Sequence, residues 1–176
     1  MRKYAFELKP EIDFYVFMQY LFFTQWEKLH AYANQQGIQI IGDIPIYVSP
    51  DSCDVWAHPE MFQVDRDLKP HGVAGVPPDY YSATGQLWGN PTYNWKVIEA
   101  DGYKWWIWRV RRNLALFDVT RIDHFRGFQA YWEIPEGEDT AINGKWKKGP
   151  RMKLFKAIKA ALGDVPIIAE DLGDID

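Results

Sequence analysis

The chain has 176 residues, of which 47 % are hydrophobic and 25 % are charged, and its net charge at pH 7 is −4. These proportions exclude a disordered or collagen-like chain, and the acidic balance gives no indication of a nucleic-acid partner. The length permits one domain with a hydrophobic core, but a complete eight-stranded α/β barrel needs about 250 residues.

A long helix is the first predicted element and covers residues 11–36. Pro10 suits the first helical position, and Glu11 lies in the first turn, where the helix dipole favours an acidic side chain. Gly37 follows the last apolar position and is typical of a helix end. A short apolar run then predicts a buried strand over residues 38–43.

The apolar run at residues 14–23 raises the question of a membrane segment. It is shorter than the about 20 residues that a span requires, and Gln19 interrupts it, so we expect a buried helix. The cleavage site of a secretory signal does not follow it. The single cysteine, Cys53, cannot form an intrachain disulfide, which favours a reducing compartment. We therefore expect a cytoplasmic location.

Proline and glycine break the regular pattern between residues 49 and 102. Their density excludes long regular elements, yet aromatic residues occur throughout the segment, and a polar linker would lack them. A long loop inside a compact domain is usually functional. We therefore interpret residues 49–102 as an ordered but irregular insertion.

Helices and strands resume after this insertion. The pattern predicts a helix at 103–114, a strand at 116–123, a loop at 127–149, a helix from Met152 to about Gly163, and a strand at 165–170. The alternation of helix and strand is typical of an α/β fold. It divides the chain into a helix and strand at 1–48, the insertion at 49–102, and the helices and strands at 103–176.

Each of the three predicted strands ends in acidic residues, namely Asp43, Asp123, and the pair Glu170 and Asp171. The carboxyl ends of parallel strands are where α/β barrels place their active sites. A single acid at such a position could equally be a helix cap or a surface charge. Three in succession, with helices between them, favour a functional site.

Asp123 has the setting of a nucleophile. Arg121 precedes it by two residues and so points to the same side of the strand, where its charge would keep the carboxylate ionised and oriented. His124 and Arg126 add hydrogen-bond donors nearby. The alternative is a purely structural ion pair between Arg121 and Asp123.

Glu170 is the candidate general acid, because partial burial at the end of an apolar strand favours the protonated form that this role requires. Two carboxyl groups in unlike environments suit chemistry on glycosidic bonds. Aromatic residues make up 16 % of the chain and offer flat platforms for sugar rings. Core packing is nevertheless the expected role of more than half of the tryptophans and tyrosines.

Other chemistries lack their sequence signals. The four histidines show no metal-ligand spacing, and a phosphate-binding loop, a dinucleotide fingerprint and a Gly-x-Ser-x-Gly motif are absent. Cys53 precedes Asp54 in a predicted loop, and we interpret it as a bystander rather than a nucleophile. The sequence therefore indicates neither a metal nor an organic cofactor.

Five motifs resemble those of the 4-α-glucanotransferases, the amylomaltases or disproportionating enzymes of glycoside hydrolase family 77, and occur in that family's order. They are Gly42-Asp43-Ile44-Pro45-Ile46-Tyr47-Val48, Asp54-Val55-Trp56-Ala57, residues 75–91, Arg121-Ile122-Asp123-His124-Phe125-Arg126-Gly127-Phe128, and Ala169-Glu170-Asp171-Leu172-Gly173. The resemblance implies part of an interrupted (β/α)₈ TIM barrel, around its strands 3–5. It also implies transfer of α-1,4-glucan segments to the 4-hydroxyl group of a sugar acceptor, by a retaining mechanism with carboxyl groups about 5–5.5 Å apart.

The resemblance also implies roles for particular residues. By the family pattern, Asp123 is the nucleophile, Glu170 is the general acid and then the base, and Arg121 orients Asp123. Asp43 supports the sugar site. The candidate substrate contacts are Tyr80, Tyr81, Gln86, Trp88 and His124. Tyr81 is phenylalanine in many relatives, a departure that keeps the aromatic ring.

The family uses a third carboxylate, an Asp after a His on a later strand, and the resemblance finds no counterpart in this chain. We therefore expect a central fragment of such an enzyme that is inactive alone and exposes strand edges that favour self-association. Two alternatives stay open. One is a related α-glucan hydrolase or debranching enzyme, and the other is a fragment that binds glucan without turnover.

Overall fold

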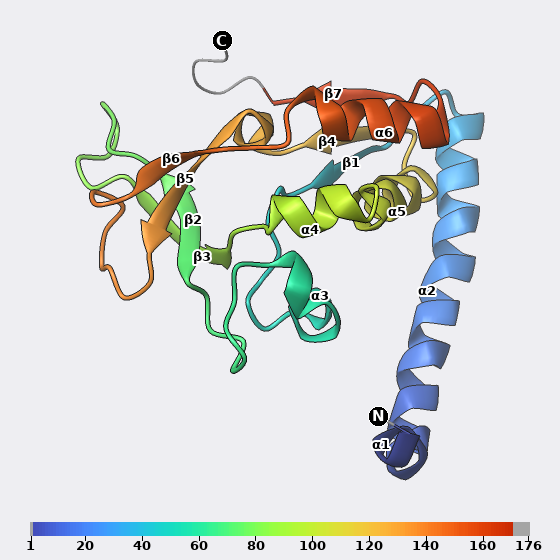
Figure 1. Cartoon of the computed structure of the whole chain (residues 1–176). Helices are drawn as coiled ribbons and strands as arrows, with labels where there is room; N and C mark the ends of the chain where they lie inside the picture. Colours follow the sequence, from blue (N-terminus) through green and yellow to red (C-terminus); the bar gives the residue numbers. More distant parts are fainter. Residues whose placement is uncertain (1, 171–176) are drawn as a thin grey trace.

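The predicted strands that end in acidic residues form one parallel sheet in the order β1-β4-β7. They are β1 (Ile41–Ile44), β4 (Val119–Ile122) and β7 (Ile167–Ala169). The computed structural model describes residues 2–170, and Figure 1 shows this sheet beside α5 and α6. The helices that precede the three strands are α2 (Lys9–Gln35), α5 (Lys104–Leu114) and α6 (Met152–Leu162). The α/β prediction is confirmed, and the described residues contain partial sheets rather than a closed barrel.

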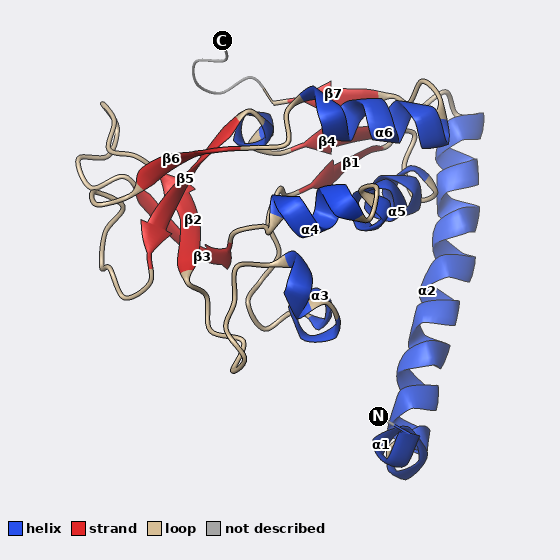
Figure 2. Cartoon of the chain, in the orientation of Figure 1, coloured by secondary structure: helices blue, strands red, loops and turns tan. Residues whose placement is uncertain are grey.

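A second sheet, antiparallel and four-stranded, lies beside the first and has the order β3-β2-β5-β6 (Figure 2). Its strands are β2 (Gly72–Val76), β3 (Gln86–Pro91), β5 (Ala130–Pro135) and β6 (Lys145–Lys148). The remaining elements are α1 (Arg2–Glu7), α3 (Cys53–Ala57), η1 (Pro59–Met61), α4 (Trp95–Ala100) and η2 (Phe125–Phe128). The prediction of a loop over 127–149 is wrong, since that segment contains β5 and β6.

Residues 49–102 contain only short elements, as expected, but they are more regular than the sequence suggests. The glycines of β2 are interpreted as loop signals in the sequence. In the structure, Gly75 instead permits β2 and β3 to pair closely. A Cβ atom on Gly75 would lie 2.1 Å from the main-chain oxygen of Gln86 in β3. The segment thus shares one sheet with residues 130–148.

Aromatic side chains from both regions form the core between the sheets and helices. Trp106, Tyr93 and Phe128 are the largest of the fully buried side chains. The Trp106 ring contacts Tyr93 at 5.8 Å and Phe128 at 5.1 Å between ring centroids. This packing fixes the insertion, α5 and the segment after β4 relative to one another.

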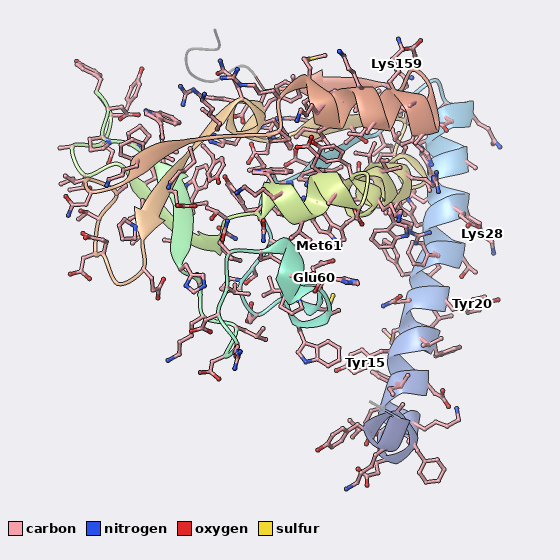
Figure 3. All side chains as sticks on the ribbon, in the orientation of Figure 1. Tyr15, Tyr20, Lys28, Glu60, Met61 and Lys159 are labelled. Atoms are coloured by element: carbon pink, nitrogen blue, oxygen red, sulfur yellow. The ribbon has the colours of Figure 1, made fainter. Side chains whose placement is uncertain are left out.

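The prediction of a buried helix at residues 14–23 is correct for the helix but wrong for its burial. The helix is present, but α2 contains no buried residue, and Phe14, Tyr15, Val16, Phe17, Met18 and Tyr20 are between 48 % and 66 % exposed. Figure 3 shows Tyr15 and Tyr20 on the part of α2 that extends beyond the sheets. The apolar run therefore has no covering element among residues 2–170. None of the helices in that range has both the length and the apolar character needed to cross a bilayer.

Asp118 attaches the other end of α2 to the parallel sheet. Its carboxylate accepts hydrogen bonds from the Ile40 N–H at 2.8 Å and from Asn34 Nδ2 and His30 Nε2 at 2.9 Å each. These contacts, with the Ile40 bond first, lower the pKa of Asp118 to about 2. Asn34 and His30 belong to α2, so one carboxylate joins that helix to the segments entering β1 and β4.

Replacing Asp118 by Asn is expected to lower the urea midpoint of unfolding at pH 7. The folded pKa of about 2 lies below the unfolded value of about 4, so the contribution is complete above pH 4. It is lost as the pH falls through 2, and the difference between the wild type and the variant should narrow over that range. Asp13→Asn, at an exposed pair with Lys9, is the control. A difference that stays constant down to pH 2 would contradict this prediction.

Candidate active site

The register of the parallel sheet brings the predicted strand-end acids to one edge. Asp43 in β1 pairs with Arg121 in β4, and Arg121 pairs with Ile168 in β7. The ladder continues one residue further, because the Asp123 N–H donates to the Ile44 oxygen and the Glu170 N–H donates to the Ile122 oxygen. Asp43, Asp123 and Glu170 therefore lie at the carboxyl ends of three adjacent strands.

Arg121 joins these three acids through its guanidinium group. Its Nη1 atom lies 2.8 Å from Asp43 Oδ1, and its Nη2 atom lies 2.7 Å from Asp123 Oδ1 and 3.1 Å from Glu170 Oε1. Hydrogen bonds to Asp43 and then to Asp123 raise the pKa of Arg121, so its positive charge persists throughout the working pH range. The prediction that Arg121 lies beside Asp123 is confirmed, and Asp43 and Glu170 join the same cluster.

The spacing of Asp123 and Glu170 limits the chemistry that they can perform. Because Asp123 Oδ1 and Glu170 Oε1 contact the same nitrogen atom of Arg121, they lie within about 6 Å of each other. Retaining glycosidases hold their carboxyl groups about 5–5.5 Å apart, whereas inverting enzymes need about 6.5–9.5 Å to admit a water molecule. The geometry suits direct attack by one carboxylate on a bond that the other protonates.

His124 connects Glu170 to the Trp88 ring of β3, which forms the aromatic wall of the site. Its backbone adopts the left-handed conformation with a φ of 51°, and its N–H donates to Glu170 Oε2 at 2.5 Å. Its ring meets Trp88 edge to face at 4.9 Å. Burial, with the Arg126 charge, outweighs Asp123 and lowers the pKa of His124, which favours the neutral ring. The His124 Nε2 atom is buried and has no hydrogen-bond partner among the described residues.

The predicted substrate contacts fall into two groups. Gln86 and Trp88 both lie in β3, where the Trp88 Nε1 donates to Gln86 Oε1 at 3.0 Å, and Trp88 reaches His124. Tyr80 and Tyr81 lie on the connection from β2 to β3 and are 96 % and 93 % exposed. Their rings contact each other at 5.6 Å, and no hydrogen bond or ring contact joins them to the acids within residues 2–170. Of the last predicted motif, Asp171, Leu172 and Gly173 lie outside the described residues.

Helix α5 holds the loop that follows Asp43, a feature that the sequence reasoning missed. Arg109 Nη2 donates to the Pro45 oxygen at 2.6 Å, and Arg109 Nη1 donates to the Ile46 oxygen at 3.3 Å. Asn113, one helical turn later, donates to the Asp43 oxygen at 3.4 Å. The available signal was the spacing of these two polar residues by four positions in a helix otherwise interpreted through its tryptophans.

The described residues contain no group of three or more His, Cys, Asp or Glu side chains that could hold a metal ion. The three clustered acids instead surround the Arg121 guanidinium, which occupies the position that a cation would need. The site therefore offers two closely spaced carboxyl groups, a fixed positive charge and an aromatic wall. This set of groups suits acid–base and nucleophilic chemistry on a sugar.

Comparison with known proteins gives matches along the whole chain. A family model for the 4-alpha-glucanotransferases of glycoside hydrolase family 77 matches residues 1–176. The 4-alpha-glucanotransferase of Aquifex aeolicus is 58 % identical over 169 residues, which are 96 % of this chain and 35 % of that protein. The Clostridium butyricum 4-alpha-glucanotransferase is 54 % identical over 174 residues, which are 98 % of this chain and 36 % of that protein.

A solved structure agrees with the fold as well. It is the amylomaltase from Streptococcus agalactiae in complex with acarbose, which is 50 % identical and superimposes with a TM-score of 0.95. The match covers 99 % of this chain and 35 % of that chain. The present chain thus spans about a third of the length of these relatives, and their activity concerns longer polypeptides.

Proposed function

Because the chain belongs to the 4-alpha-glucanotransferase family, glycoside hydrolase family 77, we propose that it supplies the catalytic centre of a retaining glucan transfer. The donor is an α-1,4-glucan, and the acceptor is the 4-hydroxyl group of a second sugar. One observation carries the proposal, namely that Arg121 contacts both Asp123 and Glu170 at the ends of neighbouring strands. This contact limits the separation of Asp123 Oδ1 and Glu170 Oε1 to about 6 Å, which is compatible with the about 5–5.5 Å of retaining enzymes.

The reaction uses two displacements. Glu170 protonates the glycosidic oxygen while the Asp123 carboxylate attacks the anomeric carbon, so the leaving glucan departs with the proton and a glycosyl ester forms on Asp123. Glu170, now ionised, takes the proton from the 4-hydroxyl group of the acceptor as that oxygen displaces Asp123. Two inversions return the original anomeric configuration. Arg121 holds the Asp123 carboxylate in place through their ion pair.

The aromatic residues of the second sheet are the proposed substrate contacts. Trp88 and Gln86 lie on the β3 wall beside His124, whose neutral ring can exchange a hydrogen bond with a sugar hydroxyl group. Asp43 supports the same sugar through Arg121. Tyr80 and Tyr81 are exposed on the β2–β3 connection and would contact a longer glucan.

Hydrolysis is the alternative reaction of this site, because water could replace the sugar acceptor at the glycosyl ester. Transfer prevails if the aromatic wall keeps water from that ester.

We also infer a cytoplasmic location from the single exposed cysteine, Cys53. The outer edges of β1 and β7 have no partner strand among residues 2–170, so self-association through these edges is part of the proposal.

A chimera tests the catalytic competence of this segment, since the chain matches only 35 % of its Aquifex relative. Residues 1–176 would replace the matching segment of that protein, and maltotriose would be the substrate. We expect glucose together with longer dextrins, which only transfer can produce. Glucose and maltose alone would indicate hydrolysis and contradict the transfer proposal. The 176-residue chain assayed in parallel is expected to show negligible turnover.

A further inference from the structure

A groove between α3 and α5 is a concave feature that the proposed catalytic centre does not use. Its volume is about 480 Å³, within the range of ligand pockets, and none of its lining residues belongs to the cluster around Arg121. One wall comes from α3 and η1, including Met61, which Figure 3 labels beside α3. The other wall comes from the first turns of α5. The groove therefore needs an explanation of its own.

Two exposed tryptophans give this groove its character. Trp56 on α3 is 62 % exposed, and Trp108 on α5 is 54 % exposed. Indole rings normally bury most of their surface, and two of them on opposite walls of one groove exceed the scattered apolar residues of an ordinary surface. Neither indole N–H has a hydrogen-bond partner among residues 2–170, so both are available to a ligand.

A few polar groups accompany the mostly apolar lining of the groove, and hydrogen bonds hold two of them, Asp54 and Asp101, in place. Trp105 is almost fully buried and donates its Nε1 hydrogen to Asp54 Oδ1 at 3.0 Å, which leaves the second oxygen of that carboxylate for a ligand. Asp101 accepts the N–H of Lys104 at the start of α5. The ammonium group of Lys104 and the two carboxylates place both donors and acceptors beside the tryptophans.

This combination selects a class of ligand. Two carboxylates beside a single lysine disfavour phosphates and other polyanions. A purely apolar partner would cover the partly buried carboxylates of Asp54 and Asp101 without offering them hydrogen bonds. A pyranose ring meets both requirements, because its C–H faces stack on indole rings while its hydroxyl groups bond carboxylates, ammonium and indole N–H groups.

We propose that this groove is a second binding site for α-1,4-glucan, separate from the catalytic cluster. Two adjoining glucose units of one chain would contact Trp56 and Trp108. The choice of α-1,4-glucan as the sugar rests on the proposed function, whereas the existence of the site rests on the groove. Such a site would hold a long glucan on the protein between successive transfers and raise its effective concentration at Asp123.

Cys53 provides a direct readout, because it is the one cysteine of the chain, is exposed and lines the groove. Bound glucan should shield it from a maleimide. In the 176-residue chain, maltoheptaose at about ten times its Kd should slow Cys53 alkylation about tenfold, because the reagent reaches only the free protein. Tryptophan fluorescence gives the Kd. Equal alkylation rates with and without maltoheptaose would overturn the proposal.

Variants show where the protecting glucan lies. Trp56→Ala and Trp108→Ala remove rings that are 62 % and 54 % exposed, and each should weaken protection about tenfold. Tyr32→Ala, an equally exposed aromatic on α2, should leave protection unchanged, as should Asp123→Asn. Protection that survives the loss of both tryptophans would overturn the proposal.

If protection is seen while the chimera transfers no glucan, the groove stands and the catalytic proposal fails. If the chimera transfers glucan but Cys53 is unprotected, only the groove inference fails.

Discussion

Replacing Asp123 by Asn is expected to reduce glucan transfer by the chimera by about 10⁴-fold or more, the scale seen when a catalytic nucleophile is removed. The amide is nearly isosteric with the carboxylate but is uncharged and does not form the glycosyl ester. Arg121 keeps Asp43 and Glu170 as partners in this variant, so the cluster retains most of its charge balance. The loss should therefore fall on kcat, with maltodextrin binding still measurable by calorimetry.

The control for this experiment is Asp67→Asn, which changes an exposed carboxylate in the turn before β2. Both variants should give the circular dichroism spectrum and the urea midpoint of the parent chimera within error. If Asp123→Asn turned over maltotriose at a near-parental rate, Asp123 would lose its assigned role. A parallel loss of binding and folding would instead assign Asp123 a structural role.

The position of the site could be predicted from the sequence because each predicted strand is followed directly by an acidic residue. The apolar segments before Asp43, Asp123 and Glu170 are short, and helices separate them, so a parallel sheet was the expected arrangement. In such a sheet the carboxyl ends of neighbouring strands meet at one edge. The spacing of Arg121 and Asp123 by two residues predicted their contact, and the observed ion pair at 2.7 Å confirms it.

The second sheet could not be predicted in the same way, because its stability depends on pairing between distant segments. β6 consists of Lys145-Trp146-Lys147-Lys148 and lacks an alternating apolar pattern, yet it pairs with β5 along its full length. β2 contains two glycines, which read as turn signals when the partner strand is unknown. Long-range pairing outweighed the local pattern in both strands.

Side-chain burial was the other point at which sequence reasoning failed. The apolar composition of α2 predicted its helix correctly but indicated nothing about what covers it, and Phe14 and Phe17 are more than half exposed. Arg109 is the opposite case, since its charge suggests a position on the surface. In the structure it lies over the Trp105 and Trp106 rings and holds the loop after Asp43. For α2 and α5 the local sequence predicts that a helix forms, whereas the contacts of each helix depend on the whole fold.

Replacing Arg121 by Gln is expected to lower kcat/KM of the chimera by about 10³-fold, comparable to the loss of an electrostatic contact made in a transition state. Arg121 touches three carboxylates, and without it the mutual repulsion of Asp43, Asp123 and Glu170 has no compensating charge among the described residues of the cluster. That repulsion moves the Asp123 carboxylate away from the position in which Arg121 holds it, so its attack on the sugar slows.

Arg121→Lys separates charge from geometry at this position. A lysine keeps the positive charge but has one nitrogen, which cannot reproduce the two-nitrogen contact with Asp43 on one side and with Asp123 and Glu170 on the other. We expect an intermediate loss of about 10²-fold in kcat/KM. Arg111→Gln, an exposed arginine on α5, is the matched control and should leave kcat/KM unchanged. If the lysine variant matched the parent in kcat/KM, a single charge would suffice, and the guanidinium would not be what spaces the two catalytic carboxyl groups.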